Sequence, residues 1–248
     1  MIFPFCLGQL TSCKPGWARL LLLLALTQTV LQYLFFYSGL AASSGVLGSI
    51  LVGAGSLWWI VLAPLCLKTP WPRWRHFCVI AVSSIGVMIA VYAPGVGSGA
   101  PFLGMILFLM ASLSGALAAI LVVPLSRLMD VKLATSGALF FGGILLMLGG
   151  VREMPRFIAS VDVSLAITTV YLAGVSAGAF GLWNWLVREY SVNVLAGYRF
   201  LIPLSAVTQS SFFIKDESPG FGIALGGILI LGSLIYLHRS EMKAHRSG

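Results

Sequence analysis

The sequence predicts an all-α fold: a polytopic transmembrane helix bundle with inverted repeats and eight spanning helices. Hydrophobic residues make up 59% of the 248 residues and charged residues only 9%, whereas an average soluble domain carries about 25% charged residues. The mean hydropathy is +1.00, and the apolar residues fall in runs of about 20, the length of a helix that crosses a bilayer. A third observation, an internal repeat, predicts how the helices are arranged.

Eight apolar runs qualify as spans, and polar residues or Pro and Gly separate them. In chain order we expect helices at Leu20–Leu40, Val46–Leu67, Phe77–Ala93, Phe102–Val123, Leu133–Val151, Val163–Val187, Val194–Phe213 and Phe221–Leu237. The connections between them, of which Arg152–Asp162 is one, are too short to hold a folded domain. Whatever the protein does is therefore expected to happen inside the bilayer.

Lysine and arginine residues between the runs predict the orientation. One side of the membrane carries Lys14, Arg19, Lys68, Arg73, Arg75, Arg127, Lys132, Arg188, Arg239, Lys243 and Arg246, and the other carries only Arg152, Arg156 and Lys215. Basic residues concentrate on the cytoplasmic side of membrane proteins. We expect a multi-pass protein of the bacterial inner (plasma) membrane with both termini in the cytoplasm. Since these residues stand singly or in small groups, the net charge of +8 indicates topology and not a nucleic-acid partner.

A shift of the chain by 147 residues superposes the first three spans on the last three without a gap. Matching positions include Ser44 and Ser191, Leu57 and Leu204, Lys68 and Lys215, and Pro72 and Pro219. The shift crosses an odd number of spans, so the two copies have opposite orientations, as in many secondary transporters. We divide the chain into an incomplete N-terminal repeat at 1–100, a C-terminal repeat at 101–240 and a cytoplasmic tail at 241–248.

Several segments resemble EamA-type members of the drug/metabolite transporter superfamily. Tyr171–Asn193 (YLAGVSAGAFGLWNWLVREYSVN) is similar to their eighth helix, which ends in an aromatic-Trp-Asn motif before a short basic loop. Val194–Gly220 looks like their ninth helix, with Pro203 at the mid-helix proline and Asp216-Glu217-Ser218-Pro219 at a Gly-Glu-x-Pro-like turn. Leu31–Leu67 is similar to their third and fourth helices. The resemblance implies export or exchange of small organic solutes (amino acids, metabolites or drugs) by alternating access.

The chain departs from that family in two ways. The family has ten helices, and this chain lacks the first two, with Met1–Leu10 resembling the last turns of the second. In the first repeat, Ser56 and Lys68-Thr69-Pro70 stand where the proline and the Gly-Glu turn are expected. The alternative function is therefore a non-transporting membrane structural or interaction protein, or an inactive truncated remnant. An eight-helix chain could also complete its cavity as a homodimer.

Enzyme chemistry has no support in the sequence. Gly174-Val175-Ser176-Ala177-Gly178 fits the G-x-S-x-G pattern of hydrolases, but that motif needs a strand–turn–helix setting and a nearby histidine, and here it lies inside an apolar helix. Two small residues four apart are a common helix-packing surface in lipid. The four cysteines form no C-x-x-C pair, so we expect no metal and no other cofactor. No constellation of His, Cys or carboxylate residues lies within the predicted spans, so we expect no catalytic residue.

Neutral polar and aromatic residues within the spans are the candidates for the substrate pathway. Amide and aromatic side chains around a central cavity suit an amphipathic organic solute. The candidates are Gln28, Gln32, Tyr33, Trp58, Tyr171, Trp183, Asn184, Arg199 and Gln209. For each uncharged member, the alternative is an interhelical hydrogen bond, worth about 0.6 kcal/mol in membranes.

Arg199 is the basic candidate, about six residues into the seventh predicted span. A charge inside a bilayer needs a polar cavity or a route to the interface. Arg199 could bind an anionic group of the solute, or its long side chain could reach the membrane surface and pair with Glu189. No Asp or Glu lies in the middle of a predicted span, so the sequence gives no support to a carboxylate proton relay.

Overall fold

The computed structural model of the chain describes residues 14–42, 51, 55–91, 102–190, and positions 195, 198, 199, 201, 202, 205, 225, 226, 228, 229, 231–233, 235, 236 and 239. The described secondary structure is entirely helical, and the described part of the chain contains no strand. The predicted all-α class is therefore confirmed. The predicted tail at 241–248, most of the last two spans, Met1–Leu10 and the candidate Gln209 lie outside the described residues.

Within the described residues, four helices are long and apolar enough to cross a membrane: Trp17–Ala42, Phe102–Leu125, Val131–Gly149 and Val163–Glu189. Each agrees with one of the predicted spans to within a few residues. Two further described helices, α4 (Gly55–Leu67) and α5 (Trp74–Val91), fall in the second and third predicted spans. The full set of eight spans and their inverted arrangement remain predictions.

The chain forms two compact units, each built from two stretches of sequence. Unit 1 contains residues 1–33 and 117–190, and unit 2 contains residues 34–116 and 191–248. The predicted division into two consecutive repeats is a separate matter and stays a prediction.

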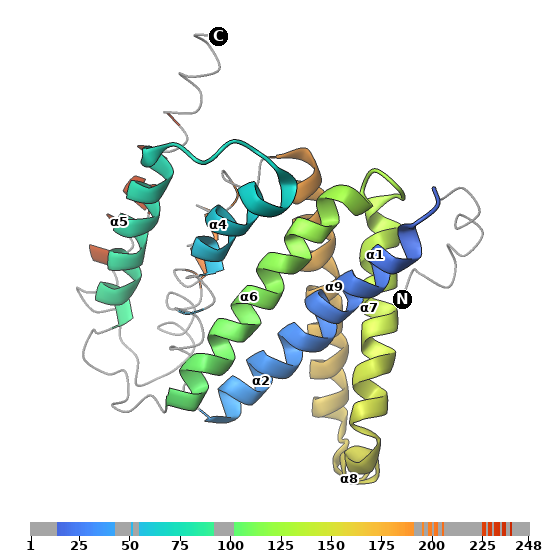
Figure 1. Cartoon of the computed structure of the whole chain (residues 1–248). Coiled ribbons are helices and arrows are strands. Elements are labelled where there is room, and N and C mark those ends of the chain that lie inside the picture. Colours follow the sequence, from blue (N-terminus) through green and yellow to red (C-terminus); the bar gives the residue numbers. More distant parts are fainter. Residues whose placement is uncertain are drawn as a thin grey trace. The chain divides into compact units, whose positions relative to one another are not determined.

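The first described helix of unit 1 is α1 (Trp17–Leu24), which continues without a break into a π-helical segment, η2 (Ala25–Leu31). The helix then continues as α2 (Gln32–Ala42), of which only Gln32 and Tyr33 belong to unit 1. The last two turns of α6 (Phe102–Leu125) lead through a tight turn to α7 (Val131–Gly149). The backbone N–H of Lys14 donates to the carbonyl of Leu128 at 3.1 Å, which ties the start of α1 to this turn. Figure 1 shows the start of α1 next to the turn before α7.

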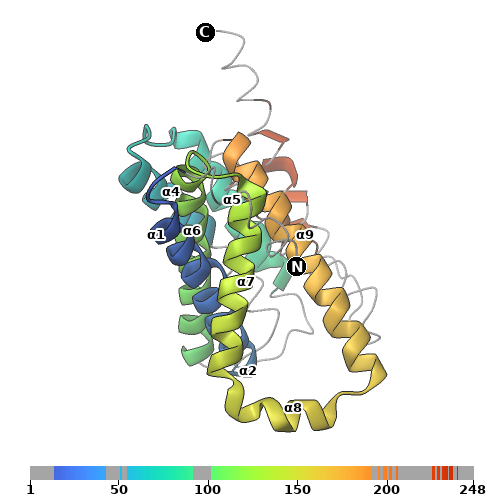
Figure 2. The ribbon, with the colours of Figure 1, turned by 90° about the vertical axis from the view of Figure 1, so that its right-hand side faces the viewer.

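A short helix interrupts the predicted connection at Arg152–Asp162. After α7, a 3-10 turn, η3 (Val151–Glu153), leads into α8 (Met154–Ser160), and α9 (Val163–Glu189) follows. Pro155 stands in the first turn of α8, where its fixed φ favours a helix and its missing N–H leaves no hydrogen bond unmade. Figure 2 shows α8 lying across the gap between the separated ends of α7 and α9. Hydrophobic length does not predict this helix, because its seven residues are too few to span a membrane.

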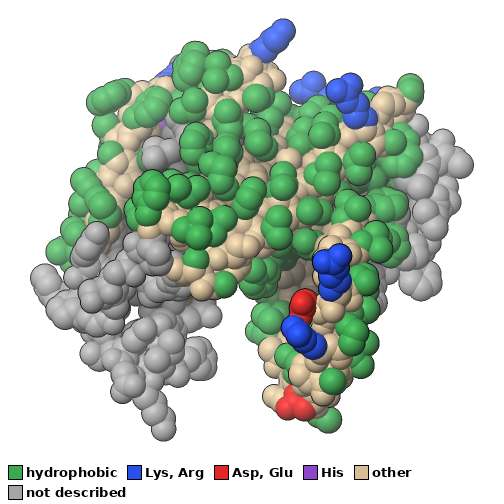
Figure 3. All heavy atoms as spheres, turned by 60° about the horizontal axis from the view of Figure 1, so that its bottom comes forward, with side chains coloured by type: hydrophobic (Ala, Val, Ile, Leu, Met, Phe, Trp, Pro, Cys, Tyr) green, Lys and Arg blue, Asp and Glu red, His purple; other side chains and the backbone are tan. Residues whose placement is uncertain are grey.

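Basic residues of unit 1 gather at its two ends. One end carries five of them, at the starts of α1 and α7 and at the end of α9. They are Lys14 and Arg19 before and within the first turn of α1, Arg127 and Lys132 before and within the first turn of α7, and Arg188 in the last turn of α9. Arg152 and Arg156 lie at the opposite end, where Arg156 pairs with Glu153 at 3.1 Å. In Figure 3 charged side chains stand among hydrophobic ones at the α8 end. This distribution agrees with helices that run antiparallel through an apolar layer.

Unit 2 has its own apolar core. Phe108 of α6 is fully buried and packs edge-to-face against Phe36, with ring centroids 5.7 Å apart. Gly39 leaves room for this ring, since a Cβ placed there would lie 3.0 Å from two ring carbons of Phe108. The buried hydroxyls of Ser83 and Ser233 lie 2.6 Å apart in a hydrogen bond that joins α5 to the C-terminal part of the chain.

Aspartates cap the two helices that follow turns in unit 1. The Asp130 side chain accepts from the backbone N–H of Lys132 at 2.8 Å, and that of Asp162 accepts from Leu165 N–H at 2.7 Å. N-capping side chains satisfy backbone donors that have no partner within the helix.

We predict that Asp162→Ala destabilises the first turn of α9 by about 1 kcal/mol, measured as faster hydrogen exchange at Leu165. Asp162→Ser should retain most of the protection, and equal exchange in both variants would contradict the cap.

Candidate functional site

A buried hydrogen-bond network joins three helices of unit 1. Asn184 of α9 donates from Nδ2 to Oε1 of Gln28 and to Oγ1 of Thr135, each at 2.9 Å. Gln28 comes from η2 and Thr135 from α7. All three side chains are buried: Gln28 is 2% exposed, Thr135 3% and Asn184 1%. Two of them, Gln28 and Asn184, are candidates predicted from the sequence, and the structure brings them together across 156 residues of chain.

The direction of each hydrogen bond in this network follows from Thr135. Its hydroxyl donates to the carbonyl of Val131 one turn earlier, at 2.8 Å, so its oxygen can only accept from Asn184. Asn184 therefore presents its NH₂ group, and both amide hydrogens are used. Gln28 must then present its carbonyl oxygen to Asn184, which directs its NH₂ group elsewhere.

The NH₂ group of Gln28 is buried and has no hydrogen-bond partner within the described part of the chain. Leaving a buried donor unsatisfied costs about 1–3 kcal/mol. Buried polar groups in native proteins are nearly always hydrogen-bonded, and each exception needs an explanation. Gln28 is therefore the residue, in the described part of unit 1, whose buried side chain retains an unused donor.

A π-helix carries Gln28. A π-turn makes i→i+5 hydrogen bonds, contains more residues than an α-turn, and is frequently found at functional sites. The π-segment ends at Leu31, and Tyr33 follows it at the second position of α2. Tyr33 packs edge-to-face on Phe180, with ring centroids 6.2 Å apart. Phe180 precedes Asn184 by one α-helical turn, whereas Tyr33 follows Gln28. The Gln28–Asn184 and Tyr33–Phe180 contacts therefore lie one after the other between two helices that run antiparallel.

Thr29 holds the π-segment against α7. Its hydroxyl donates to the carbonyl of Ala138 at 3.2 Å. A Cβ built on Gly142 would lie 2.5 Å from the Thr29 Cβ and 3.0 Å from the carbonyl oxygen of Ala25. Only glycine allows the two backbones to approach so closely. Gly142 therefore fixes the position from which Gln28 reaches Thr135 and Asn184.

The other candidates lie in several environments. In unit 1, Gln32 and Trp183 are half-buried, and Tyr171 is 67% exposed on α9. In unit 2, Trp58 is half-buried. The structure thus joins Gln28 and Asn184 by a hydrogen bond, places Tyr33 against Phe180 one turn before Asn184, and leaves Tyr171 exposed.

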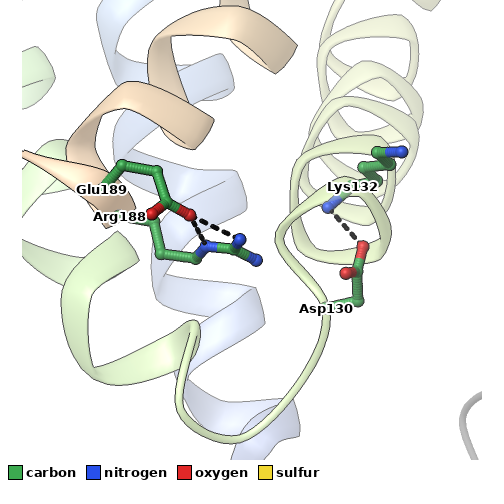
Figure 4. Close-up of polar contacts among 4 residues, drawn as sticks. All are labelled: Asp130, Lys132, Arg188 and Glu189. Carbon is green, nitrogen blue, oxygen red and sulfur yellow. Dashed lines mark hydrogen bonds and ion pairs between the residues drawn. The ribbon is translucent and has the colours of Figure 1, made fainter.

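Arg199 belongs to unit 2, where it is 7% exposed. Its guanidinium carbon lies 5.1 Å from the ring centroid of the fully buried Trp59, a cation–π geometry. Glu189, the partner considered from the sequence, binds the neighbouring Arg188 in unit 1, as Figure 4 shows. The same figure shows the Asp130 cap at the start of α7.

Sequence reasoning missed Thr135, Phe180 and the π-helix. Thr135 and Ser136 are polar positions in the otherwise apolar run from Leu133 to Leu139, which was the available signal for Thr135. Among the described residues, no group of three His, Cys, Asp or Glu side chains could hold a metal ion.

Comparisons with known proteins bear on the fold. No protein-family model matches the chain, and no curated protein matches it. The fold is similar to that of a protein of known crystal structure, with a TM-score of 0.69 and 14% identity over 92% of this chain and 80% of that one. A likeness at this identity concerns the fold alone. Fold and composition together define an all-helical protein with four described helices that can cross a membrane.

Proposed function

We propose that this protein is a membrane transporter that exports or exchanges small organic solutes, such as amino acids, metabolites or drugs, by alternating access. The observation that carries the proposal is the buried polar cluster of Gln28, Thr135 and Asn184, built from three of the helices able to cross a membrane. Polar groups in spanning helices are costly and mark substrate pathways in transporters.

The proposal includes eight spans in two inverted repeats, both termini in the cytoplasm, and the inner membrane of a bacterium. The grouping of Lys14, Arg19, Arg127, Lys132 and Arg188 at one end of unit 1 supports this orientation. The EamA-type drug/metabolite transporters, whose segments this sequence resembles, suggest the solute range. Alternating access would expose the cluster first to one side of the membrane and then to the other.

A second candidate function, a structural or interaction protein without transport, is favoured by the surface of α9. None of the most apolar 18-residue stretch of Val163–Glu189 is buried. A Cβ at Gly174, Gly178 or Gly181 would meet no atom within 4 Å. Small residues on an open helix face allow close packing of another helix in lipid, and a second copy of this chain would supply one.

Counterflow in proteoliposomes tests the proposed function. Vesicles holding the purified chain are loaded with a panel of unlabelled amino acids and amphipathic amides, and uptake of each labelled solute is followed. A transporter accumulates at least one labelled solute transiently above protein-free vesicles. A folded, inserted protein that exchanges none of the panel, yet forms a cross-linked dimer through cysteines placed at Gly174 or Gly178, supports the interaction protein and contradicts transport.

A further inference from the structure

We infer that the NH₂ group of Gln28 is the hydrogen-bond donor that binds the solute, and that its partner is an oxygen of a neutral carbonyl or amide group attached to an apolar body. This inference rests on the proposed function and assigns the chemistry of its site. It begins from the one buried donor of the cluster that finds no acceptor within the described residues.

No acceptor among the described residues pairs with the NH₂ group of Gln28. The threonine hydroxyls next to it in the sequence and in the network donate to backbone carbonyls: Thr27 to Leu23 at 2.8 Å, Thr29 to Ala138 and Thr135 to Val131. Asn184 presents nitrogen rather than oxygen to Gln28. The cluster therefore lacks an acceptor, and the atom that completes it must carry a lone pair.

A neutral acceptor fits this cluster better than a carboxylate. The basic residues of unit 1 that the structure describes lie exposed at the helix ends: Lys14, Arg19, Arg127, Lys132 and Arg188 at one end, Arg152 and Arg156 at the other. A carboxylate beside Gln28 would be removed from water and compensated by a neutral amide alone, which does not balance the loss of hydration. A carbonyl or amide oxygen has a much smaller desolvation cost.

The apolar part of the solute would contact the aromatic and aliphatic residues that precede and follow Gln28 along its helix. Tyr33, in the first turn of α2, forms an aromatic pair with Phe180 of α9. Leu24 and Ala25, just before Gln28, are fully buried. One directed donor beside an aromatic and aliphatic lining is the composition typical of small-molecule sites.

Benzamide, benzoate and benzylamine share one ring and differ in the polar group, so they separate these requirements. Binding of tritiated benzamide to the purified full chain in lipid nanodiscs is measured by scintillation proximity, with the other two as unlabelled competitors. We expect saturable binding of benzamide, with benzoate and benzylamine competing at least about tenfold more weakly. No saturable binding, or competition by benzylamine equal to that by benzamide, overturns the inference.

Gln28→Met keeps the side-chain length and removes the amide, and we expect it to weaken benzamide binding about tenfold or more. Thr27→Val is the matched control, because its hydroxyl is bonded within its own helix, and binding should stay within about twofold. Equal affinity of Gln28→Met and wild type overturns the inference. Should Gln28→Met fail to fold, the competition series on the wild-type chain decides.

The two proposals fail in different ways. If benzamide binds through Gln28 but no solute exchanges in proteoliposomes, the proposed transport is wrong and the donor site stands. If solutes exchange and the Gln28→Met variant exchanges them at the wild-type rate, transport stands and the donor site is wrong.

Discussion

Gly142→Ala is expected to destabilise the protein by about 3 kcal/mol, at the upper end of the range for overpacking. The new methyl group would lie 2.5 Å from the Thr29 Cβ and 3.0 Å from the Ala25 carbonyl oxygen. One of these atoms belongs to the backbone and the other is fixed to it, so neither can move without shifting η2 away from α7. The measurement is the free energy of reversible unfolding in detergent, followed by far-UV circular dichroism.

Gly143→Ala is the matched control for this prediction. The neighbouring glycine lies on the same helix, and a Cβ there meets no atom within 4 Å. Alanine has the higher helix propensity, by about 1 kcal/mol, so this variant should be unchanged or slightly more stable. Equal destabilisation by the two substitutions would show that α7 and the π-segment do not approach as described.

Asn184→Leu is expected to destabilise the protein by about 2 kcal/mol. The substitution removes the donor of two hydrogen bonds and leaves the oxygens of Gln28 and Thr135 buried without it. A leucine of similar volume keeps the packing, so the effect reports the lost polar contacts rather than a cavity. The measurement is again the free energy of unfolding.

A double-mutant cycle identifies the partner in this prediction. The double variant Gln28→Leu/Asn184→Leu should lose less unfolding free energy than the two single variants lose in sum. Each single substitution leaves the partner's polar atoms buried without a hydrogen bond, whereas the double substitution removes both partners. Exact additivity would show that Gln28 and Asn184 do not interact.

The ends of the long helices could be predicted from the sequence. Phe102–Val123 was expected and Phe102–Leu125 is found; Val163–Val187 was expected and Val163–Glu189 is found. Hydrophobic length determines these bounds, because a helix that crosses lipid must be apolar over about 20 residues. The caps at Asp130 and Asp162 add a local signal that any sequence reading can use.

The π-segment could not be predicted, and its consequence for Gln28 was missed with it. A run such as Leu20–Val30 is apolar at most positions, so it gives no periodicity from which a longer turn could be recognised. The widened turn is held by contacts with residues more than 100 positions away: Thr29 with Ala138, and the space left by Gly142. Such contacts exist only in the folded chain.

Part of the candidate cluster was predictable for a simple reason. Amides are rare in spanning helices and need partners there, so Gln28 and Asn184 could be selected from the sequence. The pairing of Gln28 with Asn184 depends on how η2, α7 and α9 pack together, and so does the contact of Thr135 that orients the Asn184 amide. Tyr171, selected by the same rule, lies on the exposed surface of α9, since an interfacial or lipid-facing tyrosine needs no partner in the bundle.

The proposed solute site of the transporter is the Gln28–Thr135–Asn184 cluster. Counterflow of one exchanged solute should be compared in proteoliposomes that contain equal amounts of wild type, Asn184→Leu and Gly143→Ala. We expect transient accumulation by wild type and by Gly143→Ala, and a loss of at least about tenfold in Asn184→Leu. Exchange by Asn184→Leu at the wild-type rate, or none above protein-free vesicles for the wild type, would contradict this proposal.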